Sequence, residues 1–427
     1  MVGVVYAARQ PIVLRTWMCG PQYAIVLAHT GKASTGTLSA ALRSIHLHVG
    51  RRVTERPITG ACDPLPVQEA TGAAPDLVWP RIVRDHFRKV VCLDTNMWIM
   101  LAQAATGHPK GHTWMDALAA CRLARQRGTA IFPLSNSTYV EVSKIRDPRQ
   151  RQHVATLMEE LSGFESLINP LLLKRIEMDA VLDAHAGTPA SGRTVPLLGP
   201  GVGFAFGRAI RPRIHNTETD EDITSRFLDE VPEGAELLSS ATLMMERAVL
   251  AGPADAEVPA LRALGWDPGA AWNVAEERAA EERAQAARFD EGVGNHWRRG
   301  RLRDVIGARE MLIEFGPVIK DVVAERGPDT LDSWLDRKYK LRRLVRAMPS
   351  SEVSVEMKTA LHRDAVRARR WSPNDVIDID MTSLAVPYCD VMVTEQHVHH
   401  IITTAHLDDR MGTVMLRDLR DLPPSIF

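Results

Sequence analysis

The sequence predicts an α/β protein: a mainly parallel sheet flanked by helices and interrupted by a large helical insertion. Apolar runs alternate with helical patterns over residues 81–150 and again over residues 371–427, which is how parallel sheets are built. Residues 151–370 carry almost only helical patterns. Residues 1–80 show no sustained period and are rich in Thr, Gly, Pro and Ala. We therefore predict a poorly structured extension (1–80), a first domain part (81–150), the insertion (151–370) and a second domain part (371–427).

The first domain part opens with a strand and two helices. Residues 89–94 (KVVCLD) form a short apolar run that predicts a buried strand, and NMWIMLAQA (96–104) begins a helix. Residues 113–128 predict an amphipathic helix that ends at Gly128, a common helix stop.

The remaining strand–helix units complete the sheet. Residues 129–135 predict a second strand, and residues 136–145 a helix with a serine or asparagine available as its N-cap. At the far end, residues 373–389 predict a helix and residues 390–395 (DVMVTE) a strand. Residues 405–416 predict a last helix and strand. In the insertion, residues 273–289 and 299–325 each predict one long helix.

Composition excludes several classes of protein. The 427 residues carry a net charge of −1, so any attraction to nucleic acid must be local. Five scattered cysteines without a CxxC pair argue against a zinc ribbon or a disulfide framework. No apolar run approaches the roughly 18 residues of a membrane span. We expect a cytoplasmic protein that does not enter the membrane.

Acidic residues stand at separate boundaries of the predicted elements. Asp94 ends the first strand, Glu141 lies early in the helix after the second, Asp378 lies in the helix before the last clear strand, and Asp390 opens that strand. Functional groups collect at the carboxyl ends of parallel strands, and Mg²⁺ prefers carboxylate oxygens. The four acids therefore predict one divalent-cation site. The alternative is that each acid only caps a helix or turn.

Three motifs in order resemble those of PIN-domain nucleases. VVCLDTNMWIML (90–101) resembles their opening strand, Asp-Thr-Asn and helix, and LSNSTYVEV (134–142) resembles the helix that carries a metal-site glutamate. NDVIDIDMTSLAVPYCDVMVTE (374–395) resembles their third and fourth motifs. The resemblance covers residues 88–148 and 370–427, less than half of the chain.

The resemblance implies catalytic and metal-binding roles for Asp94 and Glu141, with Thr95 or Asn96 orienting the first acid. The expected cofactor is Mg²⁺ or Mn²⁺. Its chemistry would be phosphodiester hydrolysis without a covalent protein intermediate, leaving a 5′-phosphate and a 3′-hydroxyl.

The third acid is chosen among neighbours. Asp378 is preferred to Asp375 and Asp380 because it lies sixteen residues before Thr394, a spacing similar to that of the third acid and the last-strand Thr in the family. Thr394 would support the last acid.

The chain departs from the family pattern in two places. The family often has Asp or Asn after the final Thr, where this chain has Glu395. The fourth catalytic and metal-binding acid is therefore Asp390 or Glu395; we favour Asp390 and give Glu395 a supporting role. The insertion also separates Glu141 from Asp378 by 237 residues, so it must leave and return at neighbouring points.

A basic stretch precedes the third motif. Residues 337–371 hold eleven Lys or Arg against three acids, a local net of +8. We expect this stretch to grip a phosphate backbone; the alternative is a solvated helix face. The expected nucleic-acid contacts are Arg342, Arg343, Arg346, Arg367, Arg369 and Arg370.

These observations predict a divalent-metal-dependent nuclease, with RNA favoured over DNA as substrate. The insertion offers a surface for a dedicated substrate or a protein partner. One alternative is a PIN-like module that binds nucleic acid or protein without cutting. Another is a helical interaction protein whose acids are only caps.

Overall fold

A computed structural model describes residues 2–7, 10–15, 26–29, 77–84, 87–187, 194–208, 213–216, 221–253, 256–263, 267, 269–327 and 338–427. Much of the predicted extension lies outside these residues. Its described part includes three strands, β1 (Val2–Ala7), β2 (Gln10–Arg15) and β3 (Val26–His29). They form a sheet with β10 (Arg213–Asn216). Within the described ranges, no helix is long and apolar enough to cross a membrane.

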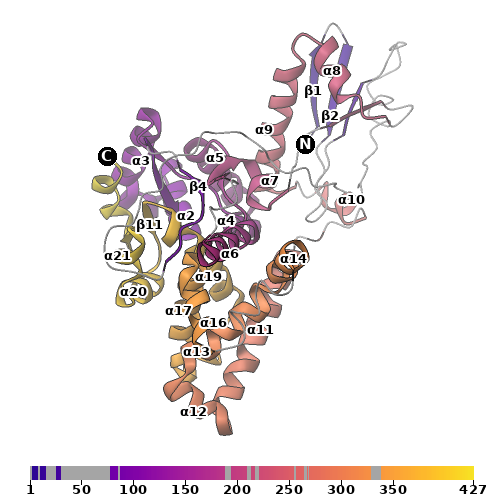
Figure 1. The fold of residues 1–427 in the computed structure, drawn as a ribbon. Helices are drawn as coiled ribbons and strands as arrows, with labels where there is room; N and C mark the ends of the chain where they lie inside the picture. Colours follow the sequence, from indigo (N-terminus) through magenta and orange to yellow (C-terminus); the bar gives the residue numbers. More distant parts are fainter. Residues whose placement is uncertain are drawn as a thin grey trace.

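A four-stranded parallel sheet lies at the centre of the α/β part. Its order is β12-β11-β5-β6, formed by Val414–Leu416, Val391–Val393, Lys89–Leu93 and Ala130–Ile131. The first and second domain parts therefore share one sheet, since β5 pairs directly with β11 from the far end of the chain. In Figure 1 these parts, violet and yellow, lie side by side. The mixed α/β class with a parallel sheet is confirmed.

Helices cover both faces of this sheet, because alternate side chains of each strand point to opposite sides. Val91 and Leu93 pack on one side and Val90 and Cys92 on the other, all at most 2% exposed. The first face is covered by α2 (Thr95–Ala105), α3 (Met115–Arg127) and α5 (Pro148–Ser162), and the second by α17 (Pro349–Arg363), α19 (Pro373–Tyr388) and α20 (Gln396–Thr404). The predicted stop at Gly128 is confirmed, with φ of 67°.

The insertion is mostly helical. Its longer helices are α6 (Pro170–Ala186), α9 (Gly234–Ala251), α11 (Ala270–Asp290), α12 (Gly292–Gly300), α14 (Gly316–Arg326) and α16 (Lys338–Ala347). Shorter ones are α7 (Gly201–Ala205), α8 (Thr224–Glu230), α10 (Val258–Ala263), α13 (Leu302–Arg309) and α18 (Ala365–Ala368). Short strands also occur: β7 (Glu165–Leu167), β8 (Val195–Pro196), which pairs with β4 (Ile82–Val83), and β9 (Leu198–Pro200).

The prediction of one helix over residues 299–325 is wrong. The chain breaks after α12, where Arg301 has φ of −136°, and a π-helical turn (Glu310–Glu314) follows α13. A new helix, α14, then begins at Gly316-Pro317. Because proline lacks the N–H that a continuous helix needs, the helix is interrupted before Pro317. The apolar residues nevertheless keep helical spacing across the break.

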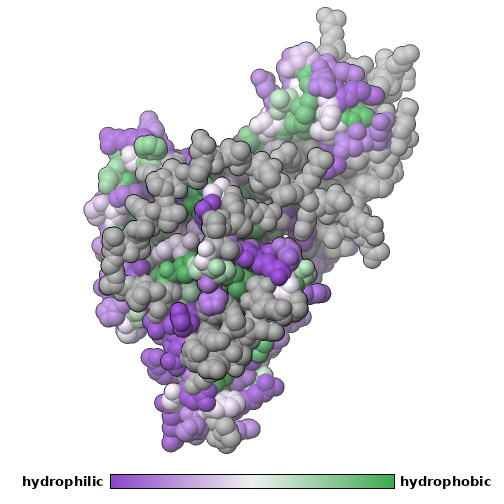
Figure 2. Space-filling model, viewed as in Figure 1, coloured by the Kyte–Doolittle hydropathy of each residue, from purple (hydrophilic) through white to green (hydrophobic). Residues whose placement is uncertain are grey.

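The insertion ends next to the sheet it left. Helices α11, α13, α16 and α17 form an elongated column that leads into α19 and then β11 (Figure 1). Figure 2 shows mainly hydrophilic residues over the lower end of this column. The column's own apolar core includes Phe289, Phe315 and Leu344. The insertion therefore folds around its own core and positions α19 against the sheet.

Candidate functional site

Asp94 follows the last residue of β5 and is the N-cap of α2. Its carboxylate accepts hydrogen bonds from the backbone N–H of Asn96 and from Thr394 Oγ1, both at 3.3 Å. Its own N–H donates to Val393 O at 3.0 Å. Asp94 is only 5% exposed. It is both a helix cap and a buried carboxylate at the carboxyl edge of the sheet.

Glu395 lies after the neighbouring strand, one residue further along than Asp94 lies after β5. It follows β11 and Thr394 and is the N-cap of α20, with no side-chain capping bond. The side-chain amide of Asn96 donates a hydrogen bond to Glu395 Oε1. Two parallel neighbours thus deliver two carboxylates to one edge, at the positive ends of α2 and α20.

Glu141 reaches this edge from α4 (Asn136–Ser143), which begins with a capping box between Ser135 and Thr138. Glu141 Oε1 lies 3.5 Å from Lys144 Nζ. Glu141 Oε2 is buried and has no hydrogen-bond partner among the described residues. A buried acceptor without a donor is costly, so this oxygen is available to a cation.

Asp378 approaches from α19, which begins with a capping box between Ser372 and Asp375. Lys144 Nζ ties α4 to this helix by donating to Asn374 Oδ1 at 3.0 Å. Asn374 and Asp378 are four residues apart and share one helix face. The Asp378 carboxylate accepts no hydrogen bond and forms no ion pair within the described part of the chain.

The pKa values of Asp94 and Asp378 are both raised, in part by the charges of neighbouring acids. Burial, followed by the charges of Glu141 and Glu395, raises the pKa of Asp94 to about 6, against the bonds from Asn96 and Thr394. Burial raises the pKa of Asp378 to about 8, with further contributions from Asp94, Glu141, Asp375 and Glu395. Charge contributions of this kind indicate that the carboxyl groups lie near one another.

The predicted fourth acid, Asp390, is elsewhere. It precedes β11, its N–H donates to Val90 O, and its carboxylate accepts from Val90 N at 2.7 Å and pairs with Arg84 at 2.6 Å. Val90 and Asp94 lie four residues apart on β5, about 13 Å along a strand. The structure therefore assigns Asp390 to the opposite edge of the sheet and brings Glu395 to the site.

The other two acids of α19 have structural partners. Asp375 closes the capping box and pairs with Arg367. Asp380 binds Arg278 at 2.6 and 2.9 Å. Thr95 is buried next to Asp94, and its Oγ1 makes no hydrogen bond among the described residues. Of the three neighbouring aspartates, only Asp378 has its carboxylate uncommitted.

Five of the eleven basic residues of the basic stretch form ion pairs. Arg342 pairs with Asp304, Arg346 with Glu352, Arg367 with Asp375 and Arg369 with Asp290. Arg343 and Arg370 are exposed. Lys358, also counted in the stretch, is buried and binds Glu310 and Glu314 at 2.7 and 3.1 Å. The local net of +8 therefore overstates the free charge of this surface.

The carboxylate oxygens of Asp94, Glu141, Asp378 and Glu395, here called the acidic cluster, suit a hard divalent cation as ligands. The four acids offer only carboxylate oxygens, one of them buried and unbonded on Glu141, which are the ligands that Mg²⁺ and Mn²⁺ take. No three His, Cys, Asp or Glu side chains in the described ranges are already arranged around a single metal position.

The sequence does not predict Lys144, and it ranks Glu395 below Asp390. Lys144 links Glu141 to Asn374 across α4 and α19; its position three residues after Glu141 was the available signal. Glu395 was given only a supporting role, although it follows an apolar strand as Asp94 does.

Comparison of the whole chain with protein-family models, curated proteins and solved structures gives no match.

Proposed function

We propose that the protein is a Mg²⁺- or Mn²⁺-dependent nuclease that hydrolyses phosphodiester bonds of RNA. The observations that support this proposal are the pairing of β5 with β11, which sets Asp94 and Glu395 at one end of the sheet, and the raised pKa values of Asp94 and Asp378, to which the neighbouring acids contribute. Hydrolysis of a phosphodiester requires neutralisation of developing negative charge. A cluster of repelling carboxylates is a poor environment for a phosphate unless a cation lies between them.

The α/β part is proposed to be a PIN-like domain. In this proposal Asp94, Glu141 and Asp378 keep the roles that the motifs imply, and Glu395 takes the fourth position in place of Asp390. The pairing of β5 with β11 supports this proposal, because it joins the first motif to the last across the insertion.

The four carboxylates would hold the cation, which when bound acidifies water and offsets charge on the phosphodiester. Asp94 is oriented by the hydroxyl of Thr394, and Glu395 by the amide of Asn96. Lys144 fixes Glu141 on one side. Asp378, with its pKa raised to about 8, can hold a proton near neutral pH in the absence of the cation.

Cleavage of a 5′-labelled single-stranded RNA tests the proposal. With Mn²⁺ present, the wild type is expected to yield products with 5′-phosphates, and Asp94→Asn and Asp378→Asn to yield none while keeping the wild-type circular dichroism spectrum. Cleavage at the wild-type rate by both variants would refute the proposal. RNA binding by the wild type without any cleavage would favour the binding-module alternative.

A further inference from the structure

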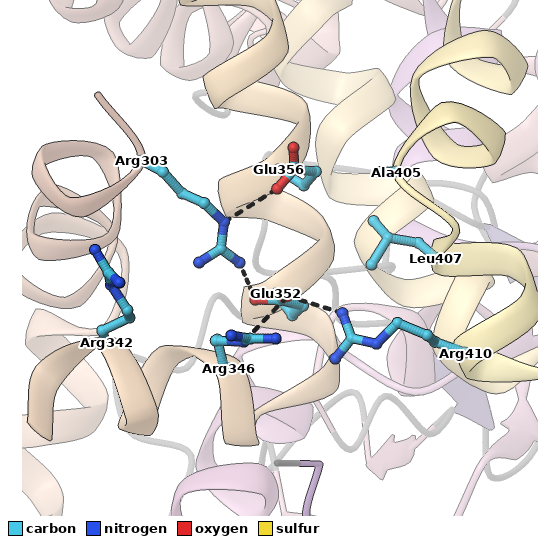
Figure 3. Close-up of a pocket in the computed structure, with 8 residues that line it drawn as sticks. All are labelled: Arg303, Arg342, Arg346, Glu352, Glu356, Ala405, Leu407 and Arg410. Atoms are coloured by element: carbon cyan, nitrogen blue, oxygen red, sulfur yellow. Dashed lines mark hydrogen bonds and ion pairs between the residues drawn. The ribbon is translucent and has the colours of Figure 1, made fainter. Parts of the chain in front are cut away.

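A pocket of about 360 Å³ lies where the helical insertion meets the second domain part. Figure 3 shows its lining, which comes from α13, α16, α17 and α21 (Leu407–Met411). Its volume falls in the range of small-molecule sites. The lining residues are Arg303, Arg342, Arg346, Glu352, Glu356, Ala405, Leu407 and Arg410.

A buried glutamate organises the arginines of this pocket. Glu352 is 3% exposed and accepts hydrogen bonds from Arg303 Nη2 at 2.5 Å and Arg410 Nη1 at 3.0 Å. Arg346 Nε lies 3.9 Å from the same carboxylate. In Figure 3 these three guanidinium groups converge on Glu352 from α13, α16 and α21. Their positions are thus fixed before any ligand arrives, which reduces the entropic cost of binding.

The arginines keep donors that the protein does not use. Arg303 donates a hydrogen bond from Nε to Glu356 and from Nη2 to Glu352, and its Nη1 makes no hydrogen bond in the described structure. Arg410 donates from Nη1 to Glu352, and its Nε and Nη2 make no hydrogen bond to the described residues. Both side chains remain partly exposed, at 30% and 23%. Each guanidinium has five N–H donors, so the pocket holds unused donors beside open space.

The arginine-rich lining of the pocket favours an anionic ligand. Four arginines and two glutamates line the pocket, and one of the arginines, Arg342, is paired with Asp304. An excess of positive charge remains, and the guanidinium fork matches a phosphate in two-point contacts. No aromatic side chain lines the pocket, so stacking on a nucleobase is not offered here. Recognition would act on phosphate rather than on a base.

We infer that this pocket binds a phosphate group, with Arg303 and Arg410 as the principal donors. The phosphate would come from a nucleic-acid strand or from a free phosphate ligand. Binding here needs neither a divalent cation nor cleavage, so the inference goes beyond the proposed nuclease activity and is tested separately from it.

Binding is measured on the full chain in EDTA, by fluorescence anisotropy of a labelled single-stranded RNA 12-mer and by calorimetry with pyrophosphate. Arg410→Gln removes one guanidinium but retains a hydrogen-bond donor for Glu352. We expect it to weaken binding about tenfold, the loss of one charge-assisted contact. Glu356→Gln removes a negative charge while still accepting from Arg303, and we expect it to tighten binding.

Arg122→Gln is the matched control, because it removes the same charge from an arginine paired with Glu160 outside the pocket. Weaker binding by Arg410→Gln, tighter binding by Glu356→Gln and unchanged binding by Arg122→Gln support the inference. This pattern with RNA alone identifies a strand as the source; the pattern with pyrophosphate identifies a free phosphate ligand. Absence of binding by both probes, or equal changes in all three variants, would overturn the inference.

Discussion

The hydroxyl of Thr394 donates a hydrogen bond to Asp94 Oδ2 at 3.3 Å, joining residues 300 positions apart in the chain. The bond connects the carboxyl ends of β5 and β11, which are adjacent and parallel. It is buried, since Thr394 is 0% exposed. A protein with a large insertion thus fixes its first and last motifs to each other directly.

Thr394→Val tests this connection. Valine has nearly the shape of threonine but cannot donate. Asp94 then loses the one side-chain donor that the described residues give it, and its pKa is expected to rise further above about 6. We expect the free energy of unfolding to fall by about 1 kcal/mol and the rate of RNA cleavage to fall as well. Chemical denaturation and the RNA assay measure both effects. Thr394→Ser keeps the hydroxyl and should behave as the wild type; equal losses in both variants would contradict the role of the bond.

The acidic cluster predicts an unusual pH dependence of stability without divalent cations. Asp94 and Asp378 have folded pKa values of about 6 and about 8, above the ordinary carboxyl value of about 4. The folded state therefore holds more protons than the unfolded chain between these limits, and its stability falls as the pH rises from about 4 to about 8.

Thermal denaturation in EDTA across this pH range measures the effect, with Asp378→Asn as the comparison. The variant removes the larger shift, so it should be more stable than the wild type at pH 8 and lose less stability between pH 6 and pH 8. A wild type whose stability rises over this interval, with no difference from Asp378→Asn, would show that the carboxylates do not repel one another.

The assignment of Asp390 to the opposite edge of the sheet predicts a variant with a structural effect only. Asp390→Ala loses the Arg84 pair and the bond from Val90 N. Because this side chain is 38% exposed, the ion pair is worth little, and the expected cost is about 1 kcal/mol, mainly from the backbone bond. Cleavage should stay within about twofold of the wild type. Loss of cleavage with an intact fold would show that Asp390 takes part in the reaction and that its assignment is wrong.

The sequence points to three of the four acids of the proposed site because each follows or flanks a recognisable apolar run. It misplaces the fourth because β11 is only three residues long and is flanked by acids on both sides, Asp390 and Glu395. Chain direction decides between them: in a parallel sheet, only the residue after the strand reaches the carboxyl edge. The side-chain bond between Asn96 and Glu395 is a tertiary contact that no local pattern indicates.

The basic stretch illustrates a second limit of sequence patterns. A charge count treats Lys358 and Arg343 alike, yet Lys358 is buried against Glu310 and Glu314, whereas Arg343 is exposed. The partners of Lys358 lie more than forty residues away, so spacing along the chain gives no sign of them. Burial, rather than composition, decides which cations remain available to a ligand.

These two residues give a matched pair of variants. Lys358→Met leaves two glutamates buried without their cation and is expected to cost about 3 to 5 kcal/mol. Arg343→Met changes an exposed side chain and should stay within about 0.5 kcal/mol of the wild type. Urea denaturation compares them. Similar stabilities of the two variants would contradict the buried ionic contacts of α17.

We propose that Asp94, Glu141, Asp378 and Glu395 together bind a divalent cation. Titration of the full chain with Mn²⁺, followed by electron paramagnetic resonance of the free ion, measures this binding. We predict saturable binding by the wild type and by Asp390→Asn, and binding weakened at least tenfold in Asp378→Asn and Glu395→Gln. Equal Mn²⁺ binding by all four proteins, or loss of binding in Asp390→Asn alone, would show that these four acids do not form the cation site.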